Sequence, residues 1–195
     1  GGETRDVVIF FCDIRGFTSL TERTGPEEVV GMLNDFYREM TEVIFKYEGT
    51  VNKYIGDALL AFYGAPIAHD DDAGRAVLAC LEMRDRLEDL NRERASLGKE
   101  PIAAGMGVHR GPVVVGNVGS PRRMEYTAIG DPVNTCQRVE SLTRQLGAGI
   151  LITEQVYREV SGLVEVRTFD PVAVKGKREP LHIYEVLGLK GGRLQ

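Results

Sequence analysis

The sequence is poor in cysteine and histidine, with three of each, and it has neither a basic excess nor a long apolar run. Cys12, Cys80 and Cys136 are odd in number and far apart, which argues against a disulfide framework or a zinc centre and predicts reduced, buried thiols. No apolar run approaches the roughly 18 residues of a membrane span, and residues 1–6 do not form a signal peptide. We therefore expect a soluble segment of a cytoplasmic protein, whose parent chain can still carry a membrane anchor elsewhere.

The charge balance argues against nucleic acid as a partner. The net charge is −5, and lysine and arginine are scattered rather than gathered in a stripe, so we expect no nucleic acid partner. The 195 residues suffice for one domain that buries a core without disulfides or a structural metal. We expect this domain over residues 6–187, with flexible tails at 1–5 and 188–195 and a regulatory domain elsewhere in the full-length protein.

The stretch from residue 7 to residue 19 organises the rest of the chain. Residues 7–12 are six consecutive apolar residues, five of them β-branched or aromatic, and they predict a central strand that is covered on both faces. Asp13 ends this strand, and Thr18 and Ser19 follow as N-caps of a short helix. Free N–H groups at the helix start suit phosphate, while Asp13 can hold the divalent cation that neutralises it. The alternative, a carboxylate that only caps a turn, stays open at this point.

A hairpin is predicted over residues 50–63, where two strand-like runs are joined at Gly56 and Asp57. If this hairpin lies beside the first strand, Asp13 and Asp57 meet at one edge of the sheet. Two carboxylates there repel each other unless a cation lies between them, which favours paired Mg²⁺ or Mn²⁺ ions. A polar turn residue with no metal role is the alternative.

Two long amphipathic helices are predicted, one from Pro26 to the stop signal Gly49 and one that opens at residues 70–72. The three aspartates at 70–72 fit the positive end of a helix dipole better than a metal cluster. A second hairpin is predicted from residues 102–109 and 112–118, and an exposed loop follows at 119–123.

Residues 126–140 carry the most informative later pattern. Asp131 as N-cap and Pro132 as the first helical residue begin a helix, which puts Asn134 and Arg138 four residues apart on one face. An amide and a guanidinium can together hold a sugar oxygen and a phosphate oxygen of one nucleotide. The alternative is an exposed surface pair, and this stretch alone does not separate the two.

Three segments in this order, residues 11–18 (FCDIRGFT), 53–57 (KYIGD) and 127–138 (TAIGDPVNTCQR), resemble the catalytic domain of class III nucleotidyl cyclases. The resemblance covers about residues 6 to 187. It implies an α/β, ferredoxin-like and palm-like sandwich, in which a mostly antiparallel central sheet is flanked by helices. It also implies a head-to-tail homodimer in which the two copies share their catalytic sites.

The resemblance further implies roles for residues at the reacting end of the nucleotide. Asp13 and Asp57, with the carbonyl of Ile14, match the ligands of two Mg²⁺ or Mn²⁺ ions per active site. Asn134 matches the residue that orients the ribose, and Arg138 matches the residue that stabilises charge at the α-phosphate.

Other matched positions bind the base and the triphosphate. Lys53 matches the residue that reads the purine ring, and Thr127 matches the residue that reads its exocyclic group. Lys175 matches a triphosphate-binding lysine, with Lys177 as the alternative. Backbone N–H groups for the β- and γ-phosphates come, by the same resemblance, from Gly16, Phe17 and Thr18.

These assignments predict an adenylate cyclase that converts ATP to 3′,5′-cyclic AMP and pyrophosphate in signal transduction. Lys53 can donate a hydrogen bond to adenine N1 but would face the N1–H donor of guanine, whereas the Thr127 hydroxyl can either donate or accept. Thr127 departs from the aspartate of vertebrate membrane cyclases, which predicts weaker rejection of GTP. The alternatives are a guanylate or dual-specificity cyclase and a non-catalytic nucleotide-binding dimerisation module; a diguanylate cyclase signature is absent from residues 56–59.

The spacing of Lys53 and Asp57 also predicts a partner subunit. Four residues of extended strand place them about 13 Å apart, so one nucleotide cannot easily present its base to Lys53 and its α-phosphate to Asp57 of the same chain. A homodimer would hold two composite sites, each with Asp13 and Asp57 from one copy. The other copy would lend Lys53, Thr127, Asn134 and Arg138.

Overall fold

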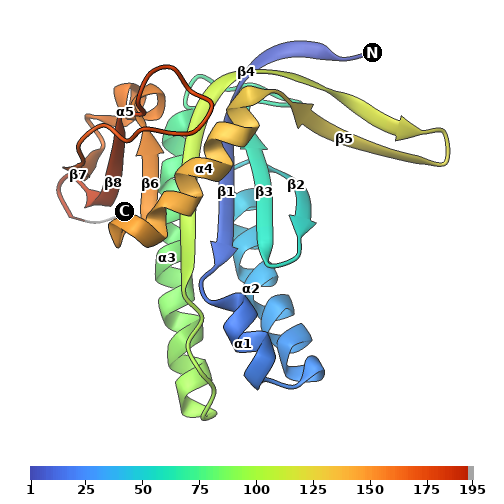
Figure 1. Cartoon of the computed structure of the whole chain (residues 1–195), viewed down its shortest axis with the longest axis vertical. Coiled ribbons are helices and arrows are strands. Elements are labelled where there is room, and N and C mark those ends of the chain that lie inside the picture. The colour runs from blue at the N-terminus through green and yellow to red at the C-terminus, as the bar shows by residue number, and fades with distance from the viewer. Residues whose placement is uncertain (193–195) are drawn as a thin grey trace.

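The computed structural model describes residues 1–192 of the chain. These residues form one mixed, mostly antiparallel sheet of eight strands and five helices, shown in Figure 1. In chain order the elements are β1 (Glu3–Ile14), α1 (Phe17–Arg23), α2 (Pro26–Lys46), β2 (Thr50–Ile55), β3 (Ala58–Tyr63), α3 (Asp72–Ser96), β4 (Ala104–Ser120), β5 (Arg123–Ile129), α4 (Asp131–Leu146), β6 (Ile150–Thr153), α5 (Glu154–Val160), β7 (Val164–Thr168) and β8 (Ile183–Leu189).

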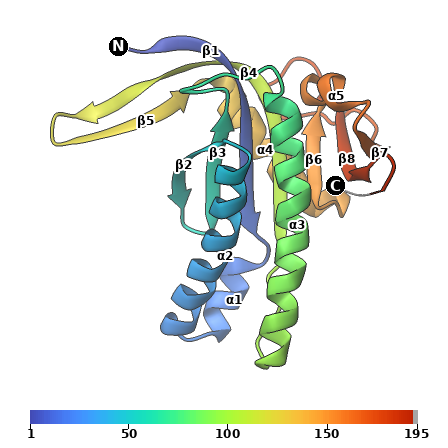
Figure 2. The same ribbon diagram turned by 180° about the vertical axis from the view of Figure 1, so that it is seen from behind.

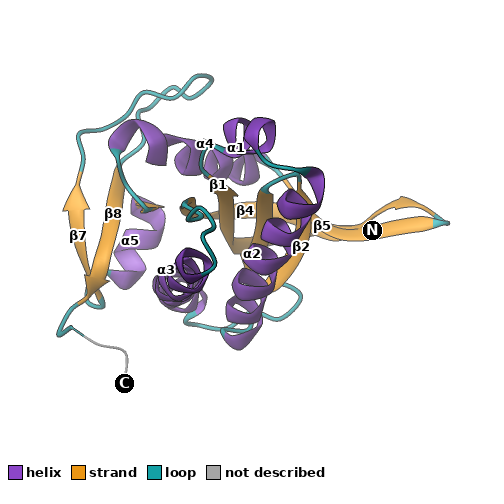
Figure 3. Cartoon of the chain, turned by 90° about the horizontal axis from the view of Figure 1, so that it is seen from below, coloured by secondary structure: helices purple, strands orange, loops and turns teal. Residues whose placement is uncertain are grey.

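The sheet has helices on both faces. Its strand order is β2-β3-β1-β4-β6-β8-β7, with β5 paired to β4, and only the β4–β6 pair is parallel. Helices α2 and α3 cover one face, as Figure 2 shows, and α4 crosses the other face in Figure 1. The view along the strands in Figure 3 separates these layers. The predicted α/β sandwich with a mostly antiparallel sheet is therefore confirmed.

The first strand is central, as its composition predicts. β1 pairs with β3 on one side and β4 on the other, so its backbone groups are hydrogen-bonded along both edges. Its side chains alternate between two apolar clusters: Phe10 packs under α2 and α3, and Phe11 packs on the face that α4 covers. This double burial explains why residues 7–12 are apolar without alternation.

Helix α2 is long and amphipathic, as predicted. It starts at Pro26 and buries Met32, Phe36, Met40 and Val43, which step by four and three along one face. The cap predictions were wrong at two other helices. Gly16, in the left-handed region at φ 66°, precedes α1, so Thr18 and Ser19 lie inside that helix. Gly130 rather than Asp131 precedes α4.

The predicted hairpin at residues 110 and 111 was also wrong. β4 runs without a break from Ala104 to Ser120, and Val7 of β1 pairs with Gly111 in the middle of it. Gly111 serves helix packing instead of a turn, because a Cβ there would come within 2.7 Å of Pro132 in α4. The turn comes later, at Pro121 and Arg122, where β4 returns as β5.

The strands β4 and β5 form an arm that extends beyond the body of the sheet (Figure 1). Sequence reasoning assigned only an exposed loop at 119–123 and missed the strand Arg123–Ile129. The base of the arm packs back on the sheet, with the rings of Tyr126 and Phe62 6.2 Å apart and Ala128 buried in the same cluster. The arm therefore places residues of β5 next to β2 and β3.

The ends of the sheet differ from the expected tails. Residues 3–5 belong to β1 and pair with residues 113–115, and β8 continues to Leu189. The expected tail at 188–195 falls partly on residues 193–195, which lie outside the described residues. Within residues 1–192, no helix combines the length and the apolar character of a membrane-crossing segment.

We expect Gly107→Ala to destabilise the fold, because α4 lies directly on this glycine. An added Cβ would be 2.7 Å from the backbone nitrogen of Glu140 and 3.0 Å from its Cα, atoms that a rigid helix cannot move cheaply. Overpacking of this kind costs roughly 1–3 kcal/mol. Urea unfolding measures the change. Gly188→Ala in β8 is the control, since its Cβ meets nothing within 4 Å; equal effects of the two substitutions would contradict this packing.

Candidate active site

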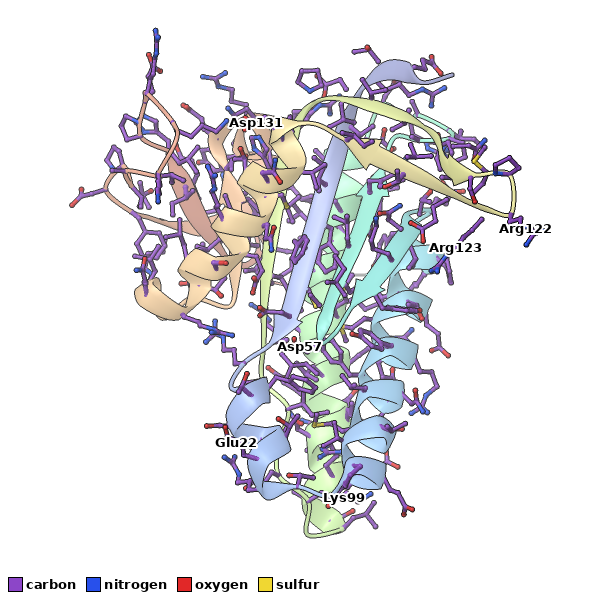
Figure 4. The ribbon with its side chains drawn as sticks, turned by 45° about the vertical axis from the view of Figure 1, so that its right-hand side comes forward. Glu22, Asp57, Lys99, Arg122, Arg123 and Asp131 are labelled. Atoms are coloured by element: carbon purple, nitrogen blue, oxygen red, sulfur yellow. The ribbon has the colours of Figure 1, made fainter. Side chains whose placement is uncertain are left out.

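Asp13 and Asp57 lie at the same edge of the sheet. Asp13 pairs with Ala58, the first residue of β3, and Asp57 precedes Ala58 in the two-residue turn after β2. Gly56 takes φ 60° in this turn, a left-handed conformation that favours glycine. Figure 4 shows Asp57 at the ends of the central strands, next to α1. Carboxylates 44 positions apart in the sequence thus meet over the start of α1.

The electrostatics of this edge fit a bound cation. Burial raises the pKa of Asp57, and the neighbouring charge of Asp13 raises it further, against backbone hydrogen bonds from Asp57 and Ile14 that lower it. Oδ1 of Asp13 is buried, and no amide, hydroxyl or basic group of the described residues donates a hydrogen bond to it. Neighbouring carboxylates repel each other, and a divalent cation would relieve the repulsion.

The donor set suits a hard cation. Asp13, Asp57 and the adjacent backbone of Ile14 offer oxygen ligands, which Mg²⁺ and Mn²⁺ prefer. Among residues 1–192 there is no cluster of three or more His, Cys, Asp or Glu side chains that could hold a metal by themselves. A cation at this edge would therefore complete its coordination with water and phosphate oxygens of a substrate.

Two further side chains of α4 reach this edge, and sequence reasoning missed both. Glu140 is 2% exposed, and its Oε1 lies 3.0 Å from where a Cβ on Gly105, the ladder partner of Asp13, would be. Burial, and then the hydrogen bond and charge of Asp13, raise the pKa of Glu140 to about 9. Arg144 places Nη2 3.9 Å from Oδ2 of Asp13. The helical period predicts on which side of α4 Glu140 and Arg144 lie relative to Arg138. It does not predict that this helix packs on Gly105, which is what brings the two side chains to Asp13.

Asn134 and Arg138 project from the exposed face of α4. Arg138 shares a surface pocket of about 410 Å³ with Arg144 and Lys175. Lys177 instead forms an ion pair with Asp131 at the start of α4. The exposed cations near Arg138 can bind an anionic group, and Lys175 is freer to do so than Lys177.

Lys53 and Thr127 belong to a second group of residues, where β2 meets β5. Nζ of Lys53 is 3.7 Å from Oε2 of Glu125, and Thr127 is 7% exposed and donates a hydrogen bond of 3.3 Å to Oδ1 of Asn52. Asn52 also donates to the carbonyl of Tyr126 at 2.8 Å. The structure thus brings together the two residues expected to read the base, and it adds Asn52 and Glu125, which sequence reasoning did not single out.

The start of α1 presents backbone donors beside Asp13. Gly16 is its N-cap residue, and within the described residues no side chain caps the first turn. The N–H groups of Phe17 and Thr18 therefore lack intrahelical partners, as at every helix start. The phosphate contacts expected of Gly16, Phe17 and Thr18 stay a prediction.

The sequence matches the family model for the adenylate and guanylate cyclase catalytic domain over residues 2–188. The chain belongs to this family, and it is a nucleotidyl cyclase catalytic domain of class III, a class whose members typically depend on metal ions.

Two curated relatives that match this chain by sequence are adenylate cyclases. The chain is 42% identical to an adenylate cyclase of Anabaena cylindrica and 34% identical to adenylate cyclase 1 of Rhizobium meliloti. These matches cover 94% and 95% of this chain but only 37% and 28% of the relatives, so the chain spans about a third of their length.

Two solved structures superpose with a TM-score of 0.89 each. The guanylyl cyclase Cya2 is 38% identical, with 97% of this chain and 95% of that chain covered. The adenylyl cyclase CyaB from P. aeruginosa is 35% identical, with 96% of both chains covered. The structural neighbours therefore include both a guanylyl cyclase and an adenylyl cyclase.

We expect Asp57→Asn to abolish stabilisation by Mn²⁺ without weakening the metal-free fold. Ionised Asp57 is disfavoured in the folded state, as its raised pKa shows, so a neutral amide removes an unfavourable charge. A ligand at about 100 times its Kd stabilises the native state by about 2.7 kcal/mol. Thermal unfolding with and without Mn²⁺ measures this shift. Asp70→Asn, at an exposed position outside the site, should keep it; a full Mn²⁺ shift in Asp57→Asn would disprove the metal role.

Proposed function

We propose that this domain is an adenylate cyclase, which converts ATP to 3′,5′-cyclic AMP and pyrophosphate. The observation that carries the proposal is the meeting of Asp13 and Asp57 at one sheet edge, where the charge of Asp13 contributes to the raised pKa of Asp57. In the reaction the ribose 3′-hydroxyl loses its proton to water or to a phosphate oxygen of the substrate, and the 3′-oxygen bonds to the α-phosphorus. The bond from that phosphorus to the oxygen bridging to the β-phosphate breaks, and pyrophosphate leaves. Two Mg²⁺ or Mn²⁺ ions held there would lower the pKa of the 3′-hydroxyl and neutralise charge on the phosphates.

Separate groups of this domain bind the cations, orient the ribose, stabilise charge and bind the triphosphate. Asp13 and Asp57 hold the cations, with the Ile14 carbonyl as a further ligand. Asn134 orients the ribose for in-line attack, and Arg138 stabilises the charge that develops at the α-phosphate. Lys175 binds the triphosphate, and the backbone N–H groups of Gly16, Phe17 and Thr18 donate to the β- and γ-phosphates.

The site is shared between two copies of the chain. Arg144 lies beside Asp13 of its own copy, and Asn134 lies ten residues earlier on the same helix, about 15 Å away along the axis at 1.5 Å per residue. Figure 4 likewise shows Asp131 and Asp57 at opposite ends of the sheet. One nucleotide therefore reaches both Asp57 and Asn134 best in a head-to-tail homodimer, which pairs each acidic edge with the α4 face of the other copy.

The parent protein is larger in this proposal. Because the chain spans about a third of its curated relatives, a regulatory domain in the full-length protein would control the cyclase and couple it to a signal. The second candidate is a guanylate or dual-specificity cyclase, favoured by the resemblance to the guanylyl cyclase Cya2. Retention of Asp13, Asp57 and Arg138 counts against a purely nucleotide-binding dimerisation module.

Product analysis tests the proposed substrate. We expect the purified domain with Mn²⁺ to convert ATP to cyclic AMP and to convert GTP more slowly, because Lys53 faces an acceptor on adenine and a donor on guanine. Chromatography of parallel ATP and GTP reactions identifies each product. Faster formation of cyclic GMP would favour the second candidate, and no product from either nucleotide would contradict the enzyme assignment.

Mixing inactive variants tests the shared site. Arg138→Ala should lower kcat by about 10²-fold, the usual scale for losing a stabiliser of transition-state charge. Asp57→Asn should lose turnover while the dimer stays folded. When equal amounts of the two variants exchange subunits, half of the dimers contain one Asp57→Asn copy and one Arg138→Ala copy. In these mixed dimers one of the two composite sites carries neither substitution. Activity should then recover to about one quarter of wild type.

The control for this mixture is a pair of variants with defects in the same half of the site. Asp13→Asn mixed with Asp57→Asn leaves one substitution in every composite site, so no activity should return. Recovery in this control, or no recovery in the mixture of Asp57→Asn with Arg138→Ala, would contradict the division of the site between copies.

A further inference from the structure

We propose that Asn52 is a specificity-determining positioning residue, which makes the hydroxyl of Thr127 an acceptor and so selects adenine over guanine. The inference rests on the proposed function for the location of the base. It adds a residue outside the three motif segments that define the family resemblance. Asn52 acts through Thr127 and does not itself need to touch the nucleotide.

A β-bulge brings Asn52 to Thr127. In the β2–β3 ladder Val51 pairs with Ala61 and Lys53 pairs with Leu60, so Asn52 is an extra residue without a partner of its own. Neighbouring residues of a regular strand point to opposite faces, but a bulge re-aims one of them. As a result both Asn52 and Lys53 contact β5, Asn52 through Tyr126 and Thr127 and Lys53 through Glu125.

The hydrogen bonds fix the direction of the amide. The carbonyl of Tyr126 can only accept, so the nitrogen of the Asn52 side chain must face it, at 2.8 Å. The amide oxygen then faces Thr127 and can only accept, which commits the Thr127 proton to it. Because Thr127 is 7% exposed, its hydroxyl needs this partner in the absence of substrate.

The committed proton decides which purine fits. With its hydrogen directed to Asn52, the Thr127 oxygen offers lone pairs to the base. The exocyclic amino group of adenine donates to such an acceptor, whereas the carbonyl oxygen of guanine would meet it lone pair to lone pair. Lys53 discriminates in the same sense at N1, and its contact with Glu125 orients it toward the same part of the site. Asn52 thus removes the ambiguity that a threonine at this position would otherwise have.

The test compares Asn52→Ala with wild type for both nucleotides. Without the amide, the Thr127 hydroxyl can rotate and donate to the guanine carbonyl. We expect the ratio of kcat/KM for ATP to that for GTP to fall about tenfold, the effect of one hydrogen bond gained by the wrong base. The analogues 3′-deoxy-ATP and 3′-deoxy-GTP lack the attacking hydroxyl, so competition between them measures binding alone. In Asn52→Ala the affinity for 3′-deoxy-ATP relative to that for 3′-deoxy-GTP should fall by the same factor.

A matched control separates specificity from damage to the fold. Asn34→Ala, which also removes an asparagine amide but at an exposed position of α2, should leave the ratio unchanged. In Thr127→Val, which has no hydroxyl, adding Asn52→Ala should cause no further change. A wild-type ratio in Asn52→Ala, or an equal fall in the Thr127→Val background, would overturn the proposal.

The readouts also distinguish this inference from the proposed function. If the wild type forms no cyclic product, the cyclase assignment fails, but competition binding by the two 3′-deoxynucleotides still reports base preference. If the wild type forms cyclic AMP and Asn52→Ala keeps its full preference in both readouts, only the role of Asn52 fails. Thermal unfolding of each variant verifies that folded protein is compared.

Discussion

Repulsion between Asp13 and Asp57 is the constraint on which the account depends. β1 is hydrogen-bonded along both edges and buried on both faces, so the backbone that carries Asp13 cannot move away from the β2–β3 turn that carries Asp57. The fold therefore holds two carboxylates close together, and burial first, with the charge of Asp13 added to it, raises the pKa of Asp57. Such rigidly placed groups with a raised pKa are typical of sites that a ligand completes.

Helix α4 connects this edge to the rest of the proposed site. Its inner face rests on glycines of β4, where the absence of side chains at Gly105 and Gly107 lets the helix approach closely. Glu140 and Arg144 thereby reach Asp13 of the same copy, while the outer face presents Asn134 and Arg138 to solvent. One helix can then support the acidic edge of its own copy and lend groups to a site in a second copy.

Much of the architecture follows from sequence patterns, and the exceptions have physical causes. Apolar periodicity predicts α2 and the central strand, and the Gly56 turn predicts the hairpin that carries Asp57. Gly111 was misleading because a glycine that admits a helix looks the same in sequence as one that turns a strand. The contacts of Glu140 and Asn52 depend on tertiary packing and on a bulge, neither of which has a local sequence signal.

Anomalous diffraction at the manganese edge tests the central claim most directly. Crystals of the domain grown with Mn²⁺ and 3′-deoxy-ATP would locate the metal without reference to activity. We predict manganese between the Asp13 and Asp57 carboxylates of one copy, on a nucleotide whose ribose and α-phosphate contact Asn134 and Arg138 of the second copy. Manganese bound away from these two aspartates, or a nucleotide held wholly within one chain, would contradict it.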